Sequence, residues 1–287
     1  MSILAKIFPL NEDGASDNYE KFKAFWSQVE GCEVEKICMK NYSPPRIEKD
    51  FENQLESLRE KFEEGKKYKY LVLAVSSHGI EKDTDGKDVT FEIVWGKDLD
   101  KRYKVNELLE KFKEVKEQKI FIMQMCRNRS DKTTVTLLGK DQGVMHHSMT
   151  EPNLPIHAPA IGNEPTPDEL TAGAHGKSRS TEALNSIAWP KTWKLAQPCI
   201  RDSIVMFSSP SGYLSYHNLN MEDAGGWIFV SMEKLLKSLK GEKISVIDLF
   251  LMVNQKMSET FTINDKFIGL SSFNHMLTQD IIIKFKN

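Results

Sequence analysis

The sequence predicts an α/β fold with a mainly parallel, helix-covered sheet. Residues 70–75 (Y-L-V-L-A-V) and 119–125 (K-I-F-I-M-Q-M) are largely apolar runs, as expected for strands that are covered on both faces. Segments with apolar residues at three- and four-residue spacing alternate with such strands. Strands that alternate with helices favour parallel pairing through crossover helices.

The first strands and helices follow one another closely. Residues 4–10 are a strand candidate, and residues 17–29 carry aromatic residues at helical spacing. A short strand is expected at residues 32–39. The two prolines at residues 44–45 begin a second helix, and Gly65 ends it.

After the strand at residues 70–75, a hairpin is expected. Its turn covers residues 83–88 and its second arm residues 89–94. An amphipathic helix at residues 105–115 then leads into the strand at residues 119–125.

Residues 131–200 differ in character from the rest. They are rich in Pro, Gly, Ser, Thr and His and show no sustained periodicity. A segment of this length without secondary structure is uncommon inside a compact domain, so we predict a flexible linker. Residues 1–130 and 201–287 are then two halves of one domain.

In the second half, a strand is predicted at residues 203–208. Helices are expected at residues 227–239 and 244–257, and a last strand near residues 275–285.

Composition argues against several function classes. Net charge is −2, from 39 basic and 41 acidic residues, so we expect no nucleic-acid partner. No apolar run reaches the roughly 18 residues that a membrane-spanning helix needs, and the N-terminus does not resemble a signal peptide. The four cysteines form no C-x-x-C pair, so neither a metal nor a cofactor is expected. A reducing, cytoplasmic location fits this pattern.

His78 and Cys126 follow the two most apolar strand candidates. Because the carboxyl ends of parallel strands meet at one edge of a sheet, we expect the two side chains to share a crevice there. A thiolate with a neighbouring histidine is the apparatus of nucleophilic catalysis. The N–H groups of Gly79 and Cys126 are the candidate oxyanion hole. The alternative is that Cys126 is a small core residue and His78 an ordinary loop residue.

The residues around this pair resemble the caspase family of cysteine proteases. Residues 124–128 (Q-M-C-R-N) match the signature Q-A-C-[RQG]-G, and His78 lies 48 residues upstream of Cys126. Residues 213–218 (Y-L-S-Y-H-N) resemble the substrate-binding loop Y-Y-S-W-R-N, and residues 226–229 (G-W-I-F) resemble G-S-W-F. Near the end, residues 276–278 resemble the last, dimer-forming strand.

The resemblance implies a caspase-like, twisted six-stranded, mainly parallel sheet with helices on both faces. Residues 1–130 would be the large-subunit-like half, residues 131–200 the intersubunit linker and residues 201–287 the small-subunit-like half. It also implies a role in cell death, protein or peptide substrates, and pairing with itself or another caspase through the C-terminal edge strand. The implied substrate-binding residues are Gln124, Leu214, Ser215, Tyr216, His217 and Glu12.

The predicted specificity pocket departs from the family pattern. The family holds a substrate aspartate with two arginines and a glutamine; here His217 replaces one arginine, and Glu12 or Asp13 stands in the register of the other. A largely neutral histidine does not replace a bidentate guanidinium, and each lost contact costs about 2–5 kcal/mol. Met125 and Asn128 also replace a small residue and a glycine beside the nucleophile.

Two functions therefore stay open. The first is a cysteine endopeptidase with altered or relaxed specificity. The second is a catalytically weak or inactive decoy caspase that regulates an active relative by dimerisation.

Overall fold

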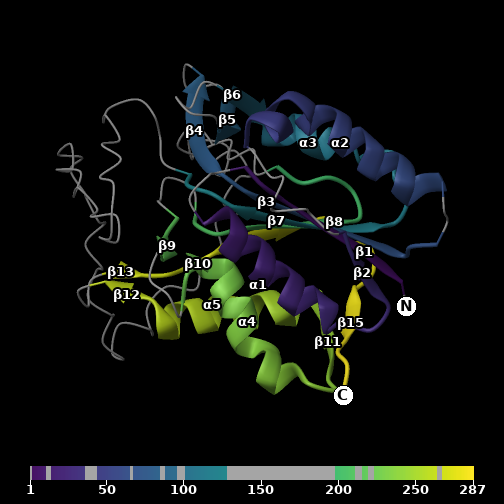
Figure 1. The fold of residues 1–287 in the computed structure, drawn as a ribbon, viewed down its shortest axis with the longest axis vertical. Helices are drawn as coiled ribbons and strands as arrows, with labels where there is room; N and C mark the ends of the chain where they lie inside the picture. Colours follow the sequence, from purple (N-terminus) through teal and green to yellow (C-terminus); the bar gives the residue numbers. More distant parts are fainter. Residues whose placement is uncertain are drawn as a thin grey trace, which may run out of the picture. The chain divides into compact units, whose positions relative to one another are not determined.

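Six strands form the main sheet of the computed structural model (Figure 1). They are β1 (Ile3–Pro9), β2 (Cys32–Val34), β3 (Tyr70–Ser76), β7 (Gln118–Gln124), β8 (Ser203–Phe207) and β14 (Ser272–His275). Their order is β14-β8-β7-β3-β1-β2, and only β14 runs antiparallel to its neighbour. The predicted six-stranded, mainly parallel sheet is confirmed.

The structure describes part of the chain. The described ranges are residues 2–10, 14–35, 44–64, 67–84, 88–95, 101–127, 198–210, 215–218, 223–263 and 267–287. All of them belong to one unit, formed by residues 1–144 and 195–287, whereas a second unit, residues 145–194, lies outside them. Of the predicted linker, only residues 198–200 are described.

Helices cover both faces of the sheet because successive strand side chains point to opposite faces. In β1, Ile3, Ala5 and Ile7 belong to one core cluster, which includes residues of α1 (Ala15–Ser27), α4 (Trp227–Leu239) and α5 (Val246–Thr260). Leu4 and Phe8 belong to the other cluster, which includes residues of α2 (Pro44–Glu64) and α3 (Val105–Glu110). Figure 1 shows these two helical layers.

Smaller sheets surround the main one. The predicted hairpin is confirmed and gains a third strand, giving the antiparallel order β4-β5-β6 with β4 (His78–Thr84), β5 (Asp88–Trp95) and β6 (Lys101–Lys104). Three further antiparallel pairs join β9 (His217–Asn218) to β10 (Gly225–Gly226), β11 (Lys243–Ser245) to β15 (Ile282–Lys284), and β12 (Thr262–Ile263) to β13 (Phe267–Ile268).

The predicted last strand, residues 275–285, is wrong in extent. The edge strand β14 ends at His275, although Met276 still exchanges backbone hydrogen bonds with Ser203 and Asp202, at 2.9 and 3.0 Å. Thr278 then donates to the Asp202 carboxylate, and the chain turns away before β15, which pairs with β11 instead. The sequence S-F-N-H of β14 carries one strongly apolar residue, so its strand character was missed.

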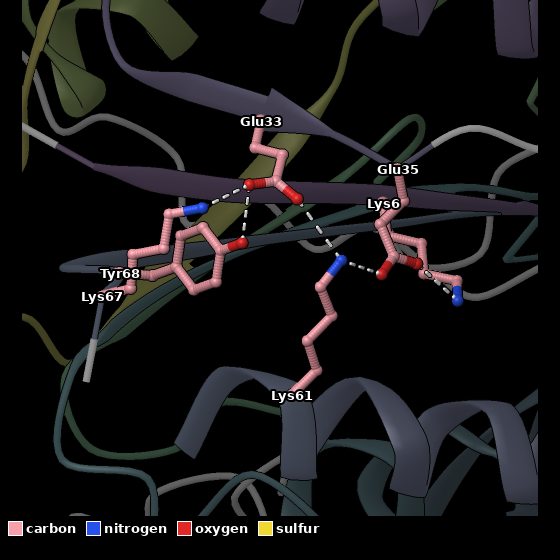
Figure 2. Close-up of polar contacts among 6 residues, drawn as sticks. All are labelled: Lys6, Glu33, Glu35, Lys61, Lys67 and Tyr68. Carbon is pink, nitrogen blue, oxygen red and sulfur yellow. Dashed lines mark hydrogen bonds and ion pairs between the residues drawn. The ribbon is translucent and has the colours of Figure 1, made fainter. Parts of the chain in front are cut away.

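A network of charged side chains lies at the edge of the main sheet formed by β2 (Figure 2). The network contains Lys6, Glu33, Glu35, Lys61, Lys67 and Tyr68. Hydrogen bonds from Lys67 and Tyr68 lower the pKa of Glu33 to about 2. Burial opposes ionisation of Glu35, but hydrogen bonds from Lys6 and Lys61 outweigh it and lower its pKa. A charged edge of this kind discourages pairing with a further strand.

Within the described residues, no helix combines the length and apolar character needed to cross a membrane.

Candidate active site

The sheet register brings the segments that carry His78 and Cys126 to the same edge of the sheet. Ser76 at the end of β3 pairs with Gln124 at the end of β7, and the Ser77 N–H donates to the Gln124 carbonyl at 3.1 Å. His78 and Cys126 each stand two residues beyond this pair, at the carboxyl edge of neighbouring parallel strands. His78 is partly exposed and opens β4, where it pairs with Val94.

Gly79 packs directly on the backbone of Cys126. A Cβ at residue 79 would lie 2.3 Å from the carbonyl oxygen of Cys126 and 3.1 Å from the Cβ of Met125. Only glycine allows the two segments to approach this closely. The two N–H groups proposed as the oxyanion hole therefore belong to segments in direct contact.

Two residues beside Cys126, Met125 and Asn128, depart from the family signature, and the structure describes the first of them. Met125 is 1% exposed and packs in the core cluster of α2 and α3, so the fold accommodates its bulk. Asn128 lies outside the described residues.

The sulfur of Cys126 faces the backbone of Ser215. The Ser215 N–H donates to Sγ at 3.3 Å, and the thiol donates to the Ser215 carbonyl at 3.5 Å. Burial raises the pKa of the Cys126 thiol, and the N–H of Ser215 partly offsets that rise. Burial therefore favours the thiol form, and the Ser215 N–H acts in the opposite direction.

Gln124 binds the segment that covers the sulfur. Its Nε2 donates to Ser215 Oγ at 2.7 Å and to the Tyr216 carbonyl at 3.3 Å, and its Oε1 accepts from the Ile228 N–H at 3.4 Å. All three side-chain contacts are internal to the protein. Gln124 thus holds residues 215–216 beside Cys126 and the start of α4.

The imidazole of His217 lies against the beginning of α1. A Cβ on Gly14 would lie 1.9 Å from its Nε2. The structure therefore brings the histidine of the predicted pocket to the segment that follows Glu12 and Asp13. Those two residues and Leu214 lie outside the described residues.

Three aromatic rings form a stack that includes Tyr216, next to Ser215. The Tyr216 ring lies 4.5 Å from that of Trp227, and the Trp227 ring lies 4.4 Å from that of Phe261, with interplanar angles of 20° and 6°. Burial raises the pKa of Tyr216. This stack fixes the Tyr216 ring to α4 and to the end of α5.

Two buried polar residues connect the site to the rest of the fold, and sequence reasoning assigned a role to neither. Asn18 on α1 donates to Ser76 Oγ at 2.6 Å and accepts from the Gly226 N–H at 2.7 Å. Arg127 places its guanidinium against both Phe91 and Phe207, 5.1 and 4.4 Å from their ring centroids. Asn18 lies between the apolar positions of an amphipathic helix, which was its one sequence signal.

Among the described residues, no group of three His, Cys, Asp or Glu side chains is arranged to hold a metal ion.

A family model for the caspase domain matches residues 22–282. The chain belongs to the caspase-domain family. This makes it a caspase-like protein of the cysteine-protease kind, and the sequence-based recognition of the family is confirmed.

Solved structures agree on the fold of this caspase-domain protein. A crystal structure of caspase-1 from Spodoptera frugiperda is similar with a TM-score of 0.55 and 17% sequence identity, covering 96% of this chain and 88% of that chain. At this identity the likeness shows a shared fold. Comparison with the curated proteins gave no match.

Proposed function

We propose that the chain is a caspase-like cysteine endopeptidase with altered or relaxed specificity. The observation that carries this proposal is the close packing of Gly79, next to His78, on the Cys126 carbonyl, just beyond the paired Ser76 and Gln124. Family membership supports extending the proposal to a role in cell death, and sparse cysteine usage supports a cytoplasmic location.

Each residue has a defined role in this reaction. His78 takes the proton of the Cys126 thiol, the resulting thiolate attacks the scissile carbonyl carbon, and the N–H groups of Gly79 and Cys126 receive the negative oxygen. His78 donates that proton to the leaving amine as the acyl-enzyme forms. Water then attacks the thioester while His78 accepts a proton from it, and His78 passes this proton to the departing sulfur, so that the carboxylic acid and the Cys126 thiol are released.

The proposed pocket favours neutral or basic residues over aspartate. His217 stands on Gly14 where the family has an arginine, and the Gln124 amide is engaged by residues 215, 216 and 228. No guanidinium pair is thus available in the predicted register to bind a carboxylate. The proposed substrate-binding residues are Gln124, Leu214, Ser215, Tyr216, His217 and Glu12.

Cleavage of a positional peptide library tests the proposal. We expect cleavage by the wild-type protein, no enrichment of aspartate before the cut bond, and loss of cleavage in Cys126→Ala and in His78→Ala. Cys199→Ala is the matched control and should keep its cleavage activity. Cys199 contacts Ser203 at the start of β8, whereas Cys126 lies near the other end of that strand. Equal background cleavage in wild type and Cys126→Ala would refute the proposal.

A decoy caspase is the second candidate, favoured by the Ser215 backbone on the Cys126 sulfur. In the described sheet, β14 is a terminal strand, and the flanking Leu270 and Met276 are 46% and 53% exposed. An open strand edge is a template for pairing with a second copy or another caspase.

Co-purification with an active caspase, followed by an assay of that caspase, tests the decoy role. We expect a complex that changes the partner's activity, and weaker binding after Met276→Asp. Leu251→Asp, an equally exposed position on α5, is the control. Absence of a complex, or a complex that leaves the partner's activity unchanged, contradicts this candidate.

A further inference from the structure

Two serine hydroxyls join the segment over the sulfur to the strand that carries Cys126. Ser208 Oγ accepts from the Met125 N–H at 2.9 Å, donates to the Met125 carbonyl at 3.2 Å and lies 2.6 Å from Ser215 Oγ. Gln124 Nε2 donates to Ser215 Oγ at 2.7 Å. Ser208 is 4% exposed, so its two contacts with Met125 are shielded from water.

One proton assignment satisfies the whole chain of contacts. Gln124 donates to Ser215 Oγ, the Ser215 hydroxyl donates to Ser208 Oγ, and the Ser208 hydroxyl donates to the Met125 carbonyl. Hydrogen bonds that run in one direction strengthen one another. The Ser215 side chain is therefore held at a fixed place, and with it the peptide N–H that lies 3.3 Å from Cys126 Sγ.

We propose that Ser208 and Ser215 are a positioning pair that aims the peptide N–H of Ser215 at the Cys126 sulfur and so stabilises its thiolate. A backbone N–H that bonds to the charged form of a group favours that form. The inference rests on the proposed function in taking Cys126 as the nucleophile. Its test reads the thiol itself and does not depend on peptide cleavage.

Other groups near the sulfur are separable from this pair. His78 comes from the neighbouring strand end, Tyr216 interacts electrostatically with Cys126, and Arg127 faces the charge of Glu81. Ser208 carries no charge at any pH in the working range. Its removal acts on the thiol through the geometry of Ser215 and not through a change of local charge.

The experiment is the pH dependence of Cys126 alkylation by iodoacetamide, read by mass spectrometry of the Cys126 peptide. The thiolate forms a sulfur–carbon bond and iodide leaves, so the rate follows the thiolate fraction. For Ser208→Ala we expect the midpoint pH of the alkylation-rate profile to rise by about 1 pH unit. The alkylation rate at pH values below that midpoint should fall about tenfold, because a hydrogen bond to the charged sulfur is lost. Ser215→Ala is expected to shift the midpoint in the same direction, and the double variant no further.

Ser203→Ala is the matched control. Its hydroxyl also bridges a backbone N–H and carbonyl, those of Ile200 at 3.2 and 2.7 Å, but at the other end of β8. It should leave the Cys126 midpoint unchanged. An unchanged midpoint in both Ser208→Ala and Ser215→Ala overturns the inference, as does an equal loss of rate at every pH. If Ser208→Ala does not fold, the comparison of Ser215→Ala with the hydroxyl-bearing Ser215→Thr decides the question, and an unshifted Ser215→Ala overturns it.

Discussion

The imidazole of His217 lies directly on Gly14, with Nε2 1.9 Å from the position that a Cβ at residue 14 would take. Gly14 also has φ of 71°, in the left-handed region, where it precedes α1. One glycine therefore meets two requirements, for backbone conformation and for space. The contact joins the two halves of the domain at the predicted specificity pocket.

Gly14→Ala is expected to destabilise the fold through both requirements. The left-handed backbone costs about 1–2 kcal/mol for a residue with a Cβ, and the overlap with the imidazole adds about 1–3 kcal/mol. Adding His217→Ala to Gly14→Ala should recover the stability lost to overlap with the imidazole. It should not recover the stability lost to the left-handed backbone. Urea denaturation of the two single variants and the double variant measures this coupling.

Gly241→Ala is the control for the backbone contribution. Gly241 has φ of 76°, and the nearest atom to its Cβ would be Oδ1 of the Asn287 side chain, at 2.7 Å. Gly241→Ala should lose about as much unfolding free energy to backbone strain as Gly14→Ala does, and this loss should show no coupling to His217→Ala. Additivity of Gly14→Ala with His217→Ala would show that the imidazole lies elsewhere.

Asn18→Leu tests the link between α1 and the two segments that frame the site. Leucine is close in size but leaves the Gly226 N–H and the Ser76 hydroxyl without their Asn18 partners. Removing one partner of a buried hydrogen bond costs about 1–3 kcal/mol, so two such bonds predict a loss of unfolding free energy near the upper end of that range. Thermal and urea denaturation measure it.

Ser231→Ala is the comparison for Asn18→Leu. Ser231 is fully buried on α4, and its hydroxyl oxygen has no hydrogen-bond partner among the described residues. The loss of unfolding free energy in Ser231→Ala should therefore be small. A change in Asn18→Leu no larger than that of Ser231→Ala would contradict the proposed role of Asn18.

Sequence patterns predicted the elements that have strong periodicity. The range predicted for the helix at residues 227–239 matches α4, and the runs at residues 70–75 and 119–125 became β3 and β7 within one residue at each end. β6 was missed because K-R-Y-K lacks apolar alternation. α3 ends at Glu110, five residues early, and backbone bonds of i to i−3 type follow it, such as that from the Phe112 N–H to the Leu109 carbonyl.

The sequence pointed to candidate site residues and not to their contacts. Strand ends and the signature around Cys126 pointed to His78, Gly79 and Gln124, because all depend on local sequence. Ser208 acts through a side chain seven residues away, and Asn18 through partners 58 and 208 residues away. Such pairings depend on the tertiary register, which one sequence does not reveal.

Arg127 is expected to be irreplaceable by lysine. The planar guanidinium lies against the rings of Phe91 and Phe207, and its Nη1 donates to Ser272 Oγ at 3.4 Å. A lysine ammonium does not stack in this way, so Arg127→Lys should lower the unfolding free energy by about 1–2 kcal/mol. Arg127→Met should cost more than Arg127→Lys, because fully buried Glu81 also loses an opposite charge.

A second substitution separates these two effects. Glu81→Gln should recover part of the loss in Arg127→Met and none of the loss in Arg127→Lys, as measured by urea denaturation. Equal stability of the lysine and wild-type proteins would show that the contact of the guanidinium with Phe91 and Phe207 contributes nothing measurable.

Glu33 makes the charged edge at β2 sensitive to acid. Folding lowers its pKa from 4.5 to about 2, first through the hydrogen bond from Lys67 and then through that from Tyr68. A group whose pKa falls on folding stabilises the folded state at pH above its unfolded value. That contribution is fully present above about pH 4.5 and is lost as the pH falls towards 2. The Glu33 side chain is 43% exposed, so solvent screening limits the contribution to about 1 kcal/mol or less.

Glu33→Gln should therefore lower the Tm by about 2 °C at pH 7 and leave it nearly unchanged near pH 2, where wild-type Glu33 is itself becoming protonated. Scanning calorimetry across this range checks the convergence of the two curves. Glu20→Gln, which removes an exposed ion pair with Lys23 on α1, should shift the Tm by less at pH 7. A Tm difference for Glu33→Gln that is the same at pH 7 and pH 2 would mean that the side chain acts through its shape and not its charge. The edge would then depend on Lys6 and Glu35, whose 2.7 Å pair is the better buried part of the network.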